Sequence, residues 1–153
     1  MLLGGGSTGT LCGWWLVNLA TLRVEGDEGA LTTMLSSLAL EPDRSWKKGE
    51  RRRVGTYSSS GFNVTVGDAE NPRELLVTIR TFLATCRDLR DVFRAPGLSV
   101  ELDIGFTVGD SEQFVAGFSF DPADLAALAD LGIALCVTAY PTSDEANAED
   151  DAT

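Results

Sequence analysis

The residues best suited to binding chemistry form a basic cluster between positions 44 and 53, RSWKKGERRR. The cluster holds six of the twelve Lys and Arg residues of a chain whose formal net charge is −11. Guanidinium groups can hold a phosphate or carboxylate, and an indole ring can stack on a base or receive a cation. The candidate binding residues are Arg44, Trp46, Lys47, Lys48, Arg51, Arg52 and Arg53. The alternative is a solvated loop whose charges pair in part with the acidic C-terminal segment, while Trp46 covers the edge of the core.

Two carboxylates, Glu101 and Asp103, are the weak candidates for catalysis. They are two residues apart in a predicted strand, so both point to the same face about 7 Å from each other. Such a pair could serve a glycosidase-like mechanism or hold a divalent ion. Strand alternation explains the two residues equally well. We therefore assign no catalytic residue beyond these two weak candidates, and we predict neither a metal site nor a cofactor.

The absence of histidine removes many catalytic templates, because histidine is the commonest general base and zinc ligand. The three cysteines, Cys12, Cys86 and Cys136, form no CxxC pair. Cys86 falls on the apolar face of a predicted helix, which favours a place in the core. This cysteine usage indicates a reducing, cytoplasmic setting.

The two ends of the chain differ from its middle. GGGSTGT resembles a phosphate-binding loop but follows no strand and lacks the lysine of that motif, so we expect a flexible leader over residues 1–10. Residues 142–153 are acidic and carry no large apolar side chain, which is typical of a disordered tail. Residues 11–141 are expected to form a single domain. The apolar run near the N-terminus is too short to span a bilayer, so no membrane association is expected.

Period-two alternation predicts strands over residues 20–25, 62–66, 98–108, 114–120 and 133–140, with GDSEQ as the turn of a hairpin between the third and the fourth. Helical spacing and capping residues predict helices that begin after Asp27, Asn71 and Asp121. The predicted order is βαβαββαβ.

Alternating strands indicate a sheet with one covered face, so we expect an α+β two-layer sandwich. It would have a mostly antiparallel sheet of about five strands, with the helices packed on one face. The open face would carry mixed polar side chains that suit either solvation or a partner: Thr21, Arg23, Glu25, Asn63, Thr65, Glu101, Asp103, Thr107, Thr138 and Tyr140.

The segment LALEPDRSWKKGERRR resembles the DUF4279 family of bacterial proteins, most specifically at Pro42, Trp46, Lys48 and Gly49. In layout the resemblance extends from Leu22 to Tyr140. It implies a bacterial origin and an α+β fold, and it supplies no activity because the family has no known function. Related small domains in toxin-immunity and phage-associated settings imply an immunity-like role.

We interpret the chain as a non-catalytic binding module whose contact site is the basic cluster with Trp46. A protein partner is favoured over nucleic acid, because the chain without its tail still carries a net charge of −6. The alternative is a small carboxylate-based or metal-dependent enzyme that uses the open sheet face. A third hypothesis is self-association through the open face or an edge strand.

Overall fold

The computed structural model describes residues 17–109 and 115–141. The leader expected over residues 1–10, the tail expected over residues 142–153 and most of the GDSEQ turn lie outside the described residues. Within the described ranges the longest helix has 14 residues, and no helix is long and apolar enough to cross a membrane.

Five strands form one sheet in the order β2-β3-β1-β4-β5. The strands are β1 (Asn18–Gly26), β2 (Arg44–Trp46), β3 (Ser60–Asp68), β4 (Leu98–Val108) and β5 (Ile133–Pro141). Neighbouring strands are antiparallel, except that β5 runs parallel to β4. The prediction of an α+β fold with a mostly antiparallel five-stranded sheet is confirmed.

The helices begin where the capping residues predict. They are α1 (Glu28–Leu38), α2 (Pro72–Thr85), α3 (Arg90–Phe93) and α4 (Pro122–Leu131), with a 3₁₀ turn η1 (Arg87–Leu89) between α2 and α3. The side chains of Asp27, Asn71 and Asp121 each accept a hydrogen bond from a backbone N–H in the first turn of α1, α2 and α4. These bonds satisfy amides that a helix end would otherwise leave unpaired.

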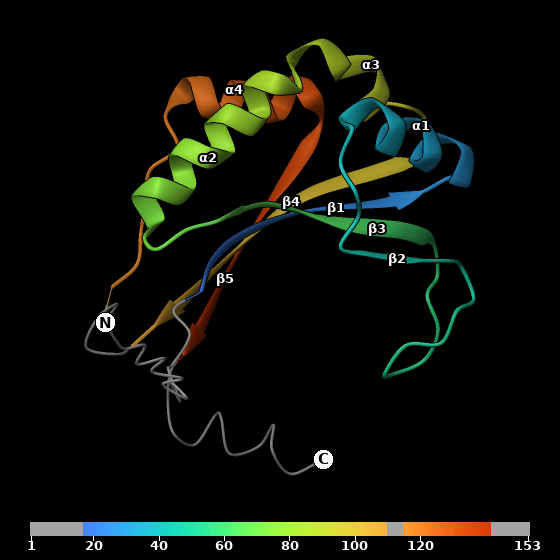
Figure 1. The fold of residues 1–153 in the computed structure, drawn as a ribbon, viewed down its shortest axis with the longest axis horizontal. Coiled ribbons are helices and arrows are strands. Elements are labelled where there is room, and N and C mark those ends of the chain that lie inside the picture. The colour runs from blue at the N-terminus through green and yellow to red at the C-terminus, as the bar shows by residue number, and fades with distance from the viewer. Residues whose placement is uncertain (1–16, 110–114, 142–153) are drawn as a thin grey trace, which may run out of the picture.

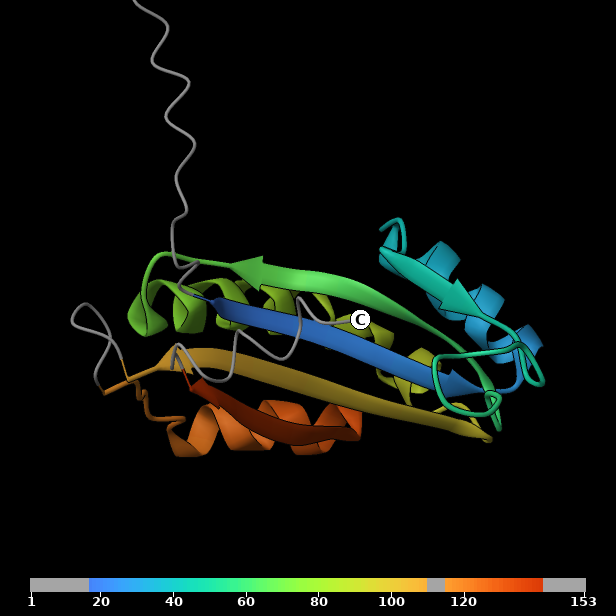
Figure 2. The same ribbon diagram turned by 90° about the horizontal axis from the view of Figure 1, so that it is seen from below.

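All four α-helices pack on one face of the sheet, and no described helix covers the other face (Figures 1 and 2). The core lies between the two layers. Ala20, Leu22 and Val24 of β1 are fully buried there against helical residues such as Met34 and Ile79. Alternate residues of the strands therefore face away from the helices, as the period-two pattern predicts.

The predicted strand over residues 114–120 is wrong, since the described residues 115–120 contain no strand. The reason is topological: β4 already lies between β1 and β5, so it has no free edge for a hairpin partner. The alternating aromatic residues serve packing instead. Phe118 makes edge-to-face contacts with Phe106, at 5.3 Å between ring centroids, and with Phe120, at 5.0 Å.

A strand that the sequence analysis did not predict, β2, lies inside the basic cluster and pairs antiparallel with β3. It has three residues and two of them are exposed, so no apolar alternation marks it. The observed order of strands and helices therefore agrees only roughly with βαβαββαβ.

Candidate functional site at the basic arm

The basic cluster lies on β2 and on the hairpin that joins β2 to β3, and we call residues 44–59 the basic arm. Its two sides are joined by backbone hydrogen bonds, with Tyr57 N donating to Glu50 O at 3.0 Å and Arg52 N donating to Gly55 O at 3.1 Å. Gly55 has a φ of +78°, a conformation that glycine adopts without strain. The basic arm projects beyond the sheet on the side away from the helices (Figure 1).

Trp46 fixes the base of the basic arm to the open face of the sheet. It pairs with Gly61 of β3, which pairs in turn with Glu25 on the polar side of β1. Directly paired residues share a face, so the indole lies outside the helix-covered core although it is only 5% exposed. A Cβ atom on Gly61 would lie 2.6 Å from the indole Cζ2, so the ring rests directly on the glycine.

Aromatic rings and guanidinium groups pack together beside this anchor. The rings of Trp46 and Tyr57 are stacked with centroids 5.1 Å apart. The guanidinium carbon of Arg23 lies 5.4 Å from the Trp46 centroid, and those of Arg44 and Arg52 lie 5.8 and 5.7 Å from the Tyr57 centroid. Cation–π contacts of this kind use the flat face of a guanidinium group, so the N–H groups at its edge can still donate hydrogen bonds.

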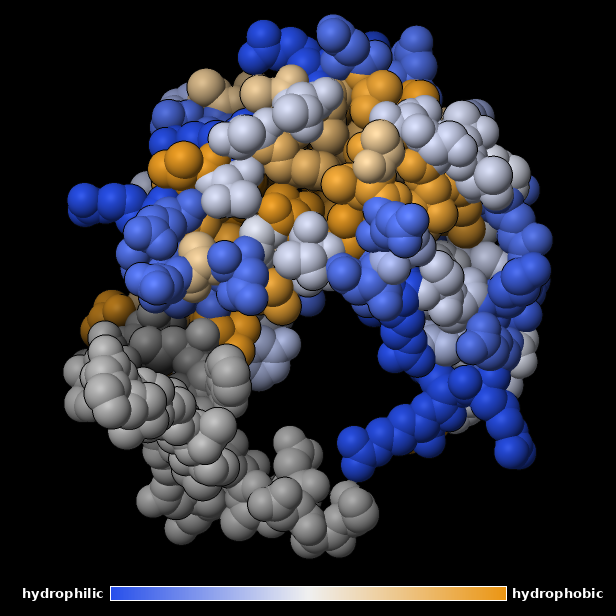
Figure 3. Space-filling model, viewed as in Figure 1, coloured by the Kyte–Doolittle hydropathy of each residue, from blue (hydrophilic) through white to orange (hydrophobic). Residues whose placement is uncertain are grey.

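The six cations of the basic arm are exposed, and none of them forms a salt bridge within the described part of the chain. The nearby Arg23 differs, because it donates to the Glu25 carboxylate. Arg52 is held at the tip through Nε, which donates to Val54 O at 2.9 Å. The basic arm therefore forms a strongly hydrophilic projection at the lower right of the surface in Figure 3.

Two buried polar atoms near the base of the basic arm lack a partner within the described residues: Trp46 Nε1 and Asn63 Oδ1. Asn63 pairs with Arg44 on one side and with Arg23 on the other, so it stands between two guanidinium-bearing residues on the open face. Buried unpaired donors and acceptors are rare in folded proteins. Both atoms are almost fully covered, so they mark a polar junction between the basic arm and the sheet that has no hydrogen bond within the described residues.

The carboxylates Glu101 and Asp103 lie on the open face of β4, both half-buried. Glu101 pairs with Arg23, so it continues the polar row that begins at Arg44 on β2, while Asp103 pairs with Thr21. The Thr138 hydroxyl donates to Asp103 Oδ1 at 3.5 Å. No cluster of three or more metal-ligating side chains occurs among the described residues. The two carboxylates share a face, and among the described residues they form no metal-binding cluster with a third acidic side chain.

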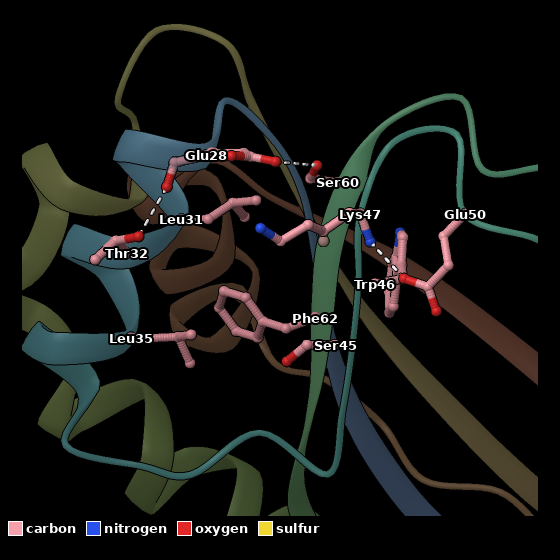
Figure 4. A pocket seen from close by; sticks show the side chains of 11 residues that line it. Glu28, Leu31, Thr32, Leu35, Ser45, Trp46, Lys47, Glu50, Ser60 and Phe62 are labelled. Atoms are coloured by element: carbon pink, nitrogen blue, oxygen red, sulfur yellow. Dashed lines mark hydrogen bonds between the residues drawn. The ribbon is translucent and has the colours of Figure 1, made fainter.

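A pocket of about 440 Å³ opens between α1 and the β2–β3 edge, next to the basic arm (Figure 4). Leu31, Leu35 and Phe62 give it apolar walls, and the Lys47 side chain points into it from the arm. Its rim is tied by Ser60, whose Oγ accepts from Lys48 N at 2.9 Å and donates to Glu28 Oε1 at 3.1 Å. The apolar walls suit an apolar side chain or part of a small ligand, while the Lys47 ammonium group and the carboxylates of Glu28 and Glu50 give the lining charges of both signs.

The structure brings the seven predicted binding residues together on one arm and adds two that the sequence analysis did not assign to the cluster, Arg23 and Tyr57. Arg23 could have been found from strand alternation, because it was already expected on the open face. Tyr57 carries no such signal, since its role depends on the hairpin that folds it back onto Trp46. Trp46 itself is largely covered and acts as an anchor more than as a free stacking surface.

The two described cysteines differ in burial. Cys86 is 1% exposed in the core, which confirms the expectation from helical spacing, and burial raises the pKa of its thiol. Cys136 is partly exposed on β5 with the Thr138 hydroxyl 3.9 Å from its Sγ. Cys12 lies outside the described residues.

Comparison with known proteins gives one finding. Residues 16–142 match the family model DUF4279, a domain of unknown function. No curated protein and no solved structure matches the chain.

Proposed function

The chain belongs to the DUF4279 family, and we propose that it is a non-catalytic binding module whose basic arm holds an acidic segment of another protein. The observation that supports this proposal most directly is that six exposed cations on one hairpin have no ion-pair partner within the described residues. We propose more specifically that the protein is bacterial and cytoplasmic and has an immunity-like role. The resemblance to the DUF4279 family supports the bacterial origin and the immunity-like role, and the cysteine usage supports the cytoplasmic setting.

The geometry of the basic arm supports recognition more than simple solvation. A solvated loop needs no internal order, whereas this one is paired across its length and fixed by Trp46 at its base. Binding then costs less conformational entropy than ordering a free loop would. Tyr57 and Arg44 add a rigid aromatic and guanidinium surface of the kind that is enriched at protein interfaces.

The charge distribution favours a protein partner over nucleic acid. Nucleic acid carries phosphates along its whole length, and it would meet the acidic body of the chain beyond the basic arm. An acidic protein segment can be short enough to contact the arm alone. The neighbouring pocket could then accept an apolar side chain of the same segment, with Lys47 close to a carboxylate.

The test uses defined probes in place of an unknown partner. Trp46 fluorescence is followed in a Trp14→Phe, Trp15→Phe background, while a short poly-glutamate peptide or a single-stranded RNA of similar charge is added. We expect the peptide to bind more tightly than the RNA. Arg51→Glu with Arg53→Glu should weaken peptide binding at least about tenfold, because both side chains are exposed and make no described contact that the fold needs.

The matched control is Arg73→Glu with Arg87→Glu, which changes the net charge equally at exposed sites outside the basic arm. Peptide affinity should then change less than about twofold. Equal losses in the two double variants would reduce the effect to net charge and contradict the proposal, and so would tighter binding of RNA. A calorimetric signal with Mg²⁺, Mn²⁺ or Ca²⁺ that disappears in Glu101→Gln would favour the carboxylate enzyme instead.

A further inference from the structure

The two edges of the sheet differ in how they are protected. The β2 edge is three residues long, carries Arg44 and forms the start of the charged basic arm. The β5 edge is nine residues long and has no charged side chain, and its pairing with β4 shows no bulge. Short length, charge and bulges are the usual devices that prevent edge-to-edge pairing. Among the described strands none pairs with the outer side of β5, so this edge is open and unprotected.

The helix-side residues of β5 are incompletely covered. Ile133, Leu135 and Val137 pair with core residues of β4, yet only Ile133 is buried. Leu135 is 40% and Val137 is 57% exposed, and Leu125 on the adjacent α4 is 51% exposed. Figure 2 shows β5 at the opposite margin of the sheet from β2, with α4 behind it. The apolar row of the core therefore continues past its helical cover to the edge of the molecule.

This margin also carries little net charge in a strongly acidic chain, because the three carboxylates of α4 and its cap lie beside three guanidinium groups, those of Arg80, Arg90 and Arg94. The acidic side chains of α4 and its cap are all paired within the molecule. Arg80 lies 2.8 Å from Asp124 and 3.5 Å from Asp121, and Arg90 lies 3.0 Å from Asp130. Two copies of a chain with a net charge of −11 repel each other over most of their surface. At α4 and β5 the local charge does not oppose their contact.

We propose that a second copy of this chain pairs with the β5 edge, forming an antiparallel dimer across a two-fold axis near Val137. In that register the nine residues of β5 lie opposite one another, although Pro141 has no N–H to donate. Val137 faces its own counterpart, and Leu135 faces the small side chain of Ala139. An isologous contact needs a self-complementary surface, and an uncharged strand paired about its own centre provides one. The basic arms lie at the far ends of the combined sheet, so this inference is independent of the proposed function.

The oligomeric state tests the proposal directly. Light scattering or sedimentation from about 1 to 100 µM should show wild type as a dimer that dissociates on dilution. Val137→Glu places two like charges opposite each other at the axis and should weaken association at least about tenfold. The matched control is Val77→Glu on α2, since Val77 is 59% exposed and therefore closely similar to Val137. This control should remain dimeric.

A cross-link keeps the test decisive if Val137→Glu fails to fold. In a Cys12→Ser, Cys136→Ser background, Val137→Cys should give a covalent dimer under mild oxidation, whereas Val77→Cys should not. Wild type that stays monomeric throughout the concentration range would overturn the proposal. So would folded Val137→Glu that dimerises like wild type, or equal cross-linking by both cysteine variants.

Discussion

Asp124 is the residue whose ionisation is most clearly coupled to the fold. Its carboxylate accepts two hydrogen bonds from Arg80 on α2, at 2.9 and 2.8 Å, and one from the backbone of Asp121 at 2.9 Å. The hydrogen bonds from Arg80 are the main reason that the pKa of Asp124 lies below its ordinary value. A single side chain therefore closes the cap of α4 and joins α4 to α2.

The first prediction concerns the pH dependence of this contact. A carboxylate whose pKa is lowered by folding stabilises the protein fully above its unfolded pKa of about 3.9, and the stabilisation disappears as the pH falls through the folded pKa. Asp124→Asn should therefore lower the melting temperature by roughly 3–8 °C at pH 7. The difference from wild type should shrink as the pH falls below about 4. Thermal unfolding followed by circular dichroism from pH 7 to pH 3 measures both quantities.

Asp130→Asn is the control, because its ion pair with Arg90 is more than half exposed on both sides. We expect a melting temperature close to that of wild type at each pH. A constant difference between Asp124→Asn and wild type at every pH would show that shape, not charge, explains the effect.

The second prediction concerns Gly61, the residue under the Trp46 indole. A methyl group there would lie 2.5 Å from Val24 O as well as 2.6 Å from the ring, and the backbone oxygen cannot move aside cheaply. Gly61→Ala should cost about 1–3 kcal/mol of unfolding free energy and shift the Trp46 emission, because the ring must lift from the sheet. Urea unfolding in the Trp14→Phe, Trp15→Phe background measures both.

Gly117→Ala provides the matched control, since nothing lies within 4 Å of the added atom and Gly117 has an ordinary φ. An unchanged Trp46 spectrum in folded Gly61→Ala would contradict the placement of the indole on the open face.

At the scale of elements, local chemistry was sufficient for much of the fold. Asp27, Asn71 and Asp121 mark three helix starts because capping depends on bonds within one turn. Alternation in β1, β3, β4 and β5 marks which side chains face the helices, because a pleated strand exposes alternate residues whatever its partner.

The elements that were missed depend on contacts distant in sequence. Residues 114–120 alternate like a strand, but pairing requires a free edge, and β1 and β5 occupy both edges of β4. β2 is a strand only because β3 supplies its hydrogen bonds. The same limit applies to the candidate site. The basic residues were evident because they cluster within ten positions of the sequence. The contact of Tyr57 with Trp46, in contrast, exists only after the hairpin closes.

At the scale of the whole molecule, the two proposed contact surfaces lie at opposite edges of one sheet. The basic arm begins with β2 at one edge, and the proposed dimer contact is β5 at the other. Pairing two copies through β5 would give a sheet of ten strands, with one basic arm near each end. At about 4.8 Å per strand the arms would stand roughly 40 Å apart. Both could then engage a densely acidic surface together, although a short peptide could occupy only one.

This arrangement gives the third prediction, which separates affinity from avidity. On a sensor surface with dense poly-glutamate, wild type should dissociate at least about ten times more slowly than Val137→Glu. When one basic arm of a dimer dissociates, the other arm keeps the dimer at the surface, so the first arm can bind again. In solution the two proteins should bind the short peptide equally, since β5 is remote from the basic arm. Val77→Glu should behave like wild type in both assays. If Val137→Glu instead weakens solution binding as much as surface binding, the two edges are coupled and the arm is not an independent module.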